Sequence, residues 1–326
     1  MMAVPSAGRD VGWLRQALQI AVELELATLP PYLCGWWSIR DRGCEAARLI
    51  RRIIGDEMYH LGTVCNLLAA VGGRPRISAA ALAYPGPLPG GVRAGVNVYL
   101  SGLTRDLVHD VMMAIEAPDD APGQDVRTSP SIGDFYSALQ QAFREAAPDL
   151  SPHGQLSAHI GSDVLKPVDS LDGAERSLEV IKEQGEGTTA SPDVSFDNDR
   201  PAHYYAFAEI YHGRRLREAG GVWRYTGAPV PFPDARPMAR LPAGGWPHTS
   251  PRVGRLLDRF DATYRDMLSA LDRAWDGDGN PRVLHAAIHA MHGLELPAVE
   301  LMESARPDAP GNYGPQFRPL FATCPS

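Results

Sequence analysis

The sequence predicts an all-α protein, a four-helix bundle with long loops and additional helices toward the C-terminus. Apolar residues recur at helical spacing over several long stretches, which is typical of amphipathic helices. The 32 glycines and 29 prolines gather between these stretches, which indicates long ordered loops over a helical scaffold. Glutamate and histidine side chains also occupy inward positions of several helices. Together these observations favour a helical bundle that encloses a polar site.

The composition limits the classes of partner. The chain has 326 residues, of which 44% are hydrophobic and 21% charged, as in ordinary globular proteins. Its net charge is −8 and it has no dense block of lysine and arginine, so neither nucleic acid nor a membrane is an expected partner. We find no apolar run of transmembrane length and no basic-then-apolar leader. Cys34, Cys44, Cys65 and Cys324 lack metal-binding spacing, so we expect reduced thiols in a cytoplasmic protein.

The first predicted helix covers residues 11–29, with Asp10 as its N-cap and two prolines at 30 and 31 as its end. Its inward row contains a carboxylate, because Leu14, Leu18, Ala21, Glu25 and Thr28 share one face. Helical phase therefore selects Glu25, rather than Glu23, as a buried acid. The alternative is that Glu25 forms a salt bridge with an arginine of a neighbouring helix.

The second predicted helix covers residues 46–71 and ends at two glycines. It contains Glu57 and His60, which lie one turn apart on the same face. Apolar residues at helical spacing bracket the pair, so both side chains should lie at or beside the buried face. A buried carboxylate without a partner costs several kcal/mol, and a metal ion is one remedy.

The third predicted helix covers residues 100–116 and places Glu116 on the same row as His109 and Met112. A carboxylate at a helix C-terminus is disfavoured by the helix dipole, so it needs a cation or a metal unless it is solvated. We predict further helices over residues 132–147, over residues 170–183 and from His203 onward.

The C-terminal part reads as a long loop excursion over residues 218–250, followed by helices over 253–275 and 282–304. We divide the chain into a bundle, residues 1–217, and this C-terminal part, residues 218–326, packed as one structural unit. The last helix carries His285, His289 and His292 on one face. These histidines could bind a transition metal, or they could form a polar face.

The polar residues of the bundle match a known set of metal ligands. Glu25 and Glu116 lie on separate helices, Glu57 and His60 share a third helix, and a later segment offers Glu186, His203 and Glu209. In carboxylate-bridged bundles four helices bind a metal pair. Two of the helices provide one glutamate each, and the other two each provide a glutamate and a histidine. Carboxylates with two imidazoles suit iron or manganese better than zinc.

At this level of detail the sequence resembles ferritin-like proteins related to iminophenyl-pyruvate dimer synthase and chromopyrrolate synthase, of the violacein and rebeccamycin pathway type. The matching motifs are ELELATLPPYL (23–33), GDEMYHLGTVCNLLAAVGGRP (55–75), AIEAP (114–118), EQGEG (183–187), HYYAFAEIYHGR (203–214) and NYGPQFRP (312–319). The resemblance implies a ferritin-like four-helix core with extra C-terminal helices. It also implies a metal site on Glu25, Glu57, His60, Glu116, Glu186 and His203.

One position departs from the pattern of that family. Relatives have a carboxylate three residues before the histidine that matches His203, whereas this chain has Arg200. Glu186 must then supply the carboxylate, and if it does not reach, the site would hold a single ion. Arg200 could instead bind a substrate carboxylate. Trp36, Trp37, Tyr204 and Tyr205 could provide aromatic walls for a substrate.

These residues predict a non-haem iron, O2-dependent oxidoreductase, with two iron ions, or one, and manganese as the alternative metal. The expected substrate is an amino-acid-derived or aromatic, nitrogen-containing small molecule of a specialised-metabolite pathway. The partners are therefore this small molecule and O2, and a homodimer is one assembly open to the chain. Two alternatives remain: an iron-binding or peroxide-scavenging protein without an organic substrate, and a non-catalytic protein that has lost its metal.

Overall fold

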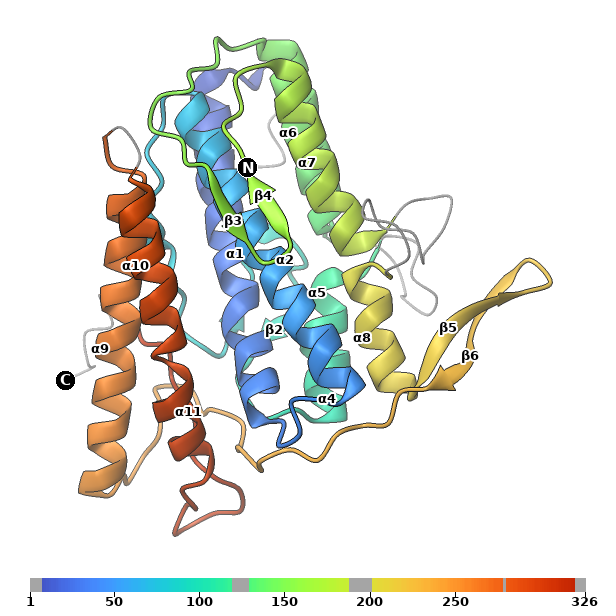
Figure 1. Cartoon of the computed structure of the whole chain (residues 1–326), viewed down its shortest axis with the longest axis vertical. Helices are drawn as coiled ribbons and strands as arrows, with labels where there is room; N and C mark the ends of the chain where they lie inside the picture. The colour runs from blue at the N-terminus through green and yellow to red at the C-terminus, as the bar shows by residue number, and fades with distance from the viewer. Residues whose placement is uncertain (1–7, 119–128, 188–200, 278–279, 320–326) are drawn as a thin grey trace.

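The computed structural model describes residues 8–118, 129–187, 201–277 and 280–319. It confirms the all-α prediction, because helices form the body of the molecule and the strands are short (Figure 1). Two long helices, α1 (Val11–Ser38) and α2 (Glu45–Ala70), pack along each other and form the centre of the bundle. Asp10 caps α1 through a hydrogen bond to the Trp13 amide, as predicted.

The other two positions of the bundle are each occupied by a helix in two pieces (Figure 1). In the third position α5 ends at Glu116 and α6 begins at Ile132; in the fourth, α7 ends at Glu186 and α8 begins at His203. Helices α6 and α7 pack against each other toward one end of the bundle. Helix α8 packs on η3 toward the other end. The bounds are α4 Arg105–Leu107, η3 Val108–Met113, α5 Ala114–Glu116, α6 Ile132–Ala146, α7 Leu171–Glu186 and α8 His203–His212.

The remaining elements cover the bundle. Helix α9 packs on α10, α11 and α3, and α11 also packs on α1, so one hydrophobic core includes residues on both sides of the 217/218 division. That division falls inside strand β5. The three sheets are antiparallel pairs, β1–β2, β3–β4 and β5–β6. The bounds are α3 Ile77–Ala80, β1 Gly86–Pro87, η2 Pro89–Gly91, β2 Asn97–Val98, β3 Ala158–Ile160, β4 Asp163–Leu165, β5 Arg214–Ala219, β6 Val222–Pro229, α9 Pro251–Ala274, α10 Pro281–His292 and α11 Glu295–Met302.

The predicted end of the first helix at residues 30 and 31 is wrong, because α1 continues through both prolines to Ser38. A proline inside a helix leaves the carbonyl four residues earlier without its amide donor. For Pro31 that carbonyl belongs to Ala27, and the Tyr84 hydroxyl donates a hydrogen bond to it at 3.0 Å. Burial of Tyr32 and Trp37 further stabilises the helical segment after the two prolines.

Removal of the Tyr84 hydroxyl should therefore destabilise the fold. We expect Tyr84→Phe to lower the free energy of unfolding by about 1–2 kcal/mol, because the buried Ala27 carbonyl loses its partner. Urea denaturation of the two proteins measures the difference. Tyr99→Phe, at another core tyrosine, is the control, because no hydroxyl contact of Tyr99 is found among the described residues. Equal losses in the two variants would contradict the role of Tyr84.

Four further predictions of local structure need correction. The third helix begins at Arg105 rather than residue 100, and its middle, η3, is a π-helix, which shifts the helical phase. His109 is therefore exposed although Met112 and Glu116 are buried. The loop predicted over residues 218–250 contains strand β6. The last predicted helix is divided into α10 and α11 near Gly293.

Three further features are the two ends of α2, the state of the cysteines and the length of the apolar helices. The Cys44 sulfur caps α2 by accepting from the Ala47 amide at 3.4 Å, and the helix stops before Gly72, as predicted. Cys34, Cys44 and Cys65 are free thiols. Among the described helices, none combines the length and the apolar character required to cross a bilayer.

Candidate metal centre

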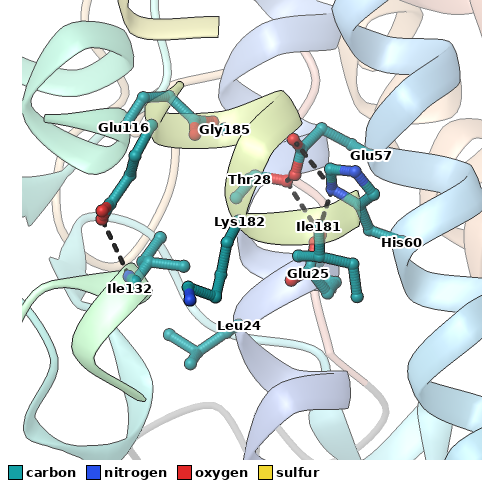
Figure 2. A pocket seen from close by; sticks show the side chains of 12 residues that line it. Leu24, Glu25, Thr28, Glu57, His60, Glu116, Ile132, Ile181, Lys182 and Gly185 are labelled. Atoms are coloured by element: carbon teal, nitrogen blue, oxygen red, sulfur yellow. Dashed lines mark hydrogen bonds and ion pairs between the residues drawn. The ribbon is translucent and has the colours of Figure 1, made fainter. Parts of the chain in front are cut away.

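Five predicted side chains come together in the middle of the bundle. They form two groups, Glu25 with Glu57 and His60, and Glu57 with Glu116 and His203, so the Glu57 carboxylate belongs to both groups. Within each group one ligand atom per residue lies within 4.8 Å of the others. Figure 2 shows Glu25, Glu57 and His60 turned toward one another. All five side chains are buried, with exposed fractions of at most 4%.

Both histidines present the Nδ1 atom to the carboxylates. His60 Nδ1 lies 3.5 Å from an oxygen of Glu25 and 3.5 Å from Glu57 Oε1. His203 Nδ1 lies 2.9 Å from Glu57 Oε1 and 3.8 Å from Glu116 Oε2. Although it is close to Glu57, His203 Nδ1 lacks a hydrogen bond of acceptable geometry to any described residue. A buried ring nitrogen without a hydrogen bond has, when unprotonated, a lone pair that is suited to bind a metal ion.

The other nitrogen of each imidazole, Nε2, lies close to a polar side chain outside the cluster. His60 Nε2 lies 2.7 Å from Gln184 Oε1, and His203 Nε2 lies 3.3 Å from Asp56 Oδ2. With a metal bound, donation by these nitrogens would leave each Nδ1 unprotonated and aimed at the cluster. Metal-binding histidines in proteins commonly bond their second nitrogen to a carboxylate or carbonyl in this way.

Each carboxylate is also held by a hydroxyl group. The Thr28 hydroxyl donates to Glu57 Oε2 at 2.7 Å, and the Tyr32 hydroxyl donates to Glu116 Oε1 at 2.6 Å. The Tyr136 hydroxyl donates to Glu25 Oε1. In all three cases the opposite oxygen faces the imidazoles. One oxygen of each carboxylate thus accepts a hydrogen bond from a hydroxyl group, and the other oxygen points toward the imidazoles.

Electrostatics explain how this cluster exists in a buried site. Burial, followed by the adjoining Glu57 carboxylate, raises the pKa of Glu25 to about 7, although hydrogen bonds from His60 and Tyr136 oppose the rise. Burial works against the charged form of His60, but Glu25 and Glu57 outweigh it and raise the pKa of His60 to about 10. The pKa of His203 is raised by Asp56, Glu116 and Glu57. Burial also raises the pKa of Tyr32 and Tyr136, so both remain protonated donors.

Without a metal, protonated imidazoles therefore balance the carboxylates, and with a metal the ion would replace these protons. The donor set of carboxylates and imidazoles is the set that iron and manganese accept. Each group offers three protein side chains to a metal ion, and the Glu57 carboxylate is common to both groups. The residues present could therefore hold a metal ion.

Glu186 lies at the edge of this centre rather than within the two groups. It lines the same small cavity of about 20 Å³, but its Oε1 accepts a hydrogen bond from the Gly133 amide at 2.8 Å. A Cβ at Gly133 would collide with the end of the Glu186 side chain, so a larger residue there would displace this carboxylate. The assignment of Glu186 as a ligand stays a prediction.

The residues predicted for the substrate lie elsewhere. The Trp36 indole donates to the Ala47 carbonyl and stacks under Arg42, and Tyr204 packs on Tyr205. Neither Trp36 nor Tyr204 is among the described residues that line the cavity. Trp37 is a core residue stacked on Phe317. Arg200 lies outside the described residues.

Two other groups considered from the sequence are not part of the centre. Glu209 is buried, and its carboxylate binds Arg215 Nη1 at 2.6 Å and the Leu216 amide at 2.8 Å, so it serves a structural ion pair. The three histidines of α10 are exposed. They do not belong to either of the two clusters found among the described residues. Their arrangement agrees with a polar face.

The residues that contact the five clustered side chains were not predicted from the sequence. Asp56 precedes Glu57 directly, and a second acid beside a metal-binding motif was a signal that could have been used. Thr28 was placed on the buried row, but its role toward Glu57 depends on how α1 and α2 meet. Tyr32, Tyr136 and Gln184 had no local signal, because each acts on a residue far away in the sequence.

Comparison with known proteins agrees with this fold. The chain belongs to the ferritin-like family, whose model matches residues 18–212. The structure is similar to the crystal structure of a ferritin-like protein from Caulobacter vibrioides, with a TM-score of 0.68 and 22% identity, over 94% of this chain and 97% of that one. At this identity the likeness shows the fold alone. A search of curated proteins gave no significant match. The predicted ferritin-like fold is confirmed, and the relationship to the bisindole-pathway synthases stays a prediction.

Proposed function

We propose that the chain binds a pair of metal ions, iron in the first place, and acts as an O2-dependent oxidoreductase. The observation that supports this most is the pair of buried three-ligand groups that share Glu57. A structural role alone would need only one carboxylate for each imidazole. Here three carboxylates and two imidazoles converge, each with one atom facing the others.

The side chains of the centre have separate tasks in this proposal. A pair of ferrous ions would supply the electrons for reduction of dioxygen. Thr28, Tyr32 and Tyr136 hold the carboxylates, while Gln184 and Asp56 hold the imidazole rings. The apolar side chains of Leu24, Ile132 and Ile181 line part of the cavity and would limit the amount of water beside the metal.

The substrate class follows from the resemblance noted in the sequence. We propose an amino-acid-derived or aromatic, nitrogen-containing small molecule of specialised metabolism. The cavity of about 20 Å³ holds a molecule of about the size of water, so an aromatic ring would require side chains at its edge to move. Lys182 is the long, flexible side chain in that position.

The same small volume favours a second candidate function. An iron-binding protein that reduces peroxide needs room only for a small oxidant, and the cavity provides this. The two candidates share the metal centre and differ in the second substrate.

The metal content per chain tests both candidates at their common point. Protein purified without oxygen after growth with iron should contain about two iron ions per chain by elemental analysis, since two ligand groups are available. One ion would mean that only one of the groups is a site, and would overturn the di-iron proposal. No metal in a folded protein would indicate a non-catalytic protein. Consumption of O2 or of hydrogen peroxide by the ferrous protein then separates the two candidates.

A further inference from the structure

A second cavity lies on the other side of α1 and α2 from the metal centre. Its volume is about 130 Å³, and five structural units line it: α1, α2, the β3–β4 hairpin, α9 and α10. Figure 1 shows the hairpin beside α2, and α10 packed on α9. Glycines allow the close approach of the hairpin, because the Cβ of a residue at Gly62 would lie 3.1 Å from Leu165.

The lining of this cavity is almost entirely apolar. No lysine, arginine, aspartate or glutamate is found among the described residues that line it. The indole nitrogen of Trp275 is already bonded to Asn66 Oδ1 at 2.9 Å, so Trp275 offers an apolar ring to the cavity. Met58, Met267 and Met291 contribute three flexible thioether side chains, which adapt well to ligands of different shapes.

The cavity is also accessible. His159 and Gly161 at its edge are exposed, and Met58, Ile288 and Met291 are only partly buried. Its entrance therefore lies between the turn of the β3–β4 hairpin and helix α10. An unfilled apolar cavity lowers the stability of a fold in proportion to its volume, so a ligand that fills it would be stabilising.

We propose that this cavity is a binding site for an uncharged apolar molecule of about the size of one aromatic ring or a short alkyl chain. An apolar cavity of about 150 Å³ is known to bind benzene, and the present cavity is of similar volume and chemistry. A charged ligand would be left without a partner inside it. The site shares no lining residue with the metal cavity.

The two sites nevertheless share two helices. Leu26, Leu29, Met58 and Leu61 line the apolar cavity, and each directly follows a residue of the metal cavity, Glu25, Thr28, Glu57 or His60. The helices α1 and α2 thus separate the ligand in one cavity from the metal ligands in the other.

Binding of toluene and of benzoate, which is the same ring with a carboxylate, tests the proposal by isothermal titration calorimetry. Toluene should bind saturably with one molecule per chain, and benzoate should not bind. Ala287→Leu introduces a larger side chain at a buried lining position and should weaken toluene binding by at least about tenfold. Ala286→Leu, at the exposed neighbouring position of α10, is the matched control and should bind as the wild type does.

Three outcomes would overturn the proposal: no saturable binding of toluene, equal binding in Ala287→Leu and wild type, or tighter binding of benzoate. Loss of toluene binding as protein concentration rises would mean that a second copy of the chain occupies the cavity, which also overturns it. The His60→Ala variant separates the two sites, because it should bind toluene normally whether or not it still binds metal.

Discussion

Glu57→Gln should abolish the binding of both metal ions, since Glu57 is the residue that the two ligand groups share. Glutamine has the same shape, and its carbonyl oxygen can still accept the hydrogen bond from Thr28. The substitution removes the negative charge of the carboxylate that lies between the two imidazoles. Because loss of an outer-shell partner already costs about 10–100-fold in metal affinity, loss of a shared ligand should cost more. We expect less than about a tenth of the wild-type metal content by elemental analysis.

The control for this variant is Glu209→Gln. Glu209 is as buried as Glu57, at 3% exposed, but its carboxylate binds Arg215 rather than the cluster. Glu209→Gln should retain the full metal content even if the fold loses some stability. Retention of two ions by Glu57→Gln would contradict the shared role of Glu57, and loss of metal in both variants would point to damage to the fold.

His60→Ala should remove one ion and leave the other. His60 belongs only to the group with Glu25, whereas the group with Glu116 keeps its three ligands. The metal content should fall from about two ions to about one per chain, with helix content by circular dichroism nearly unchanged. Unchanged metal content would overturn the assignment of His60 as a ligand.

The histidines of α10 provide the control for His60→Ala. A triple variant with alanine at His285, His289 and His292 removes three exposed imidazoles outside the two clusters. Its metal content should equal that of the wild type. Loss of half the metal in the triple variant would show that the exposed face of α10 binds one of the ions.

Helical phase predicted the most local part of the centre well. The row that contains Leu14, Leu18 and Ala21 is buried, and it selected Glu25 correctly as the buried acid of the first helix. Glu57 and His60 also lie on one face of α2, because their spacing alone determines this. These predictions needed only the period of an α-helix.

Contacts between distant segments were not predictable in the same way. The helix end predicted at the two prolines failed because a hydroxyl from Tyr84 replaces a missing backbone donor. The phase of the third helix failed because a π-helical segment does not follow the α-helical period. Its start differs because Thr104 caps the helix, which begins at Arg105. The tyrosine that holds Glu25 comes from α6, and sequence spacing says nothing about this contact.

The interruption of the third and fourth bundle helices has a consequence for the unfolded chain. The ligand residues occur on α1, α2, α5 and α8, so they are widely separated in the sequence and meet only after these helices have packed. A bound metal pair would thus act as a cross-link that closes several long loops, and long loops lose the most chain entropy on closure. Metal would bind the assembled chain far better than the unfolded one, and so it would raise the unfolding temperature by mass action. Bound ions would then link the end of α5, at Glu116, to the start of α8, at His203.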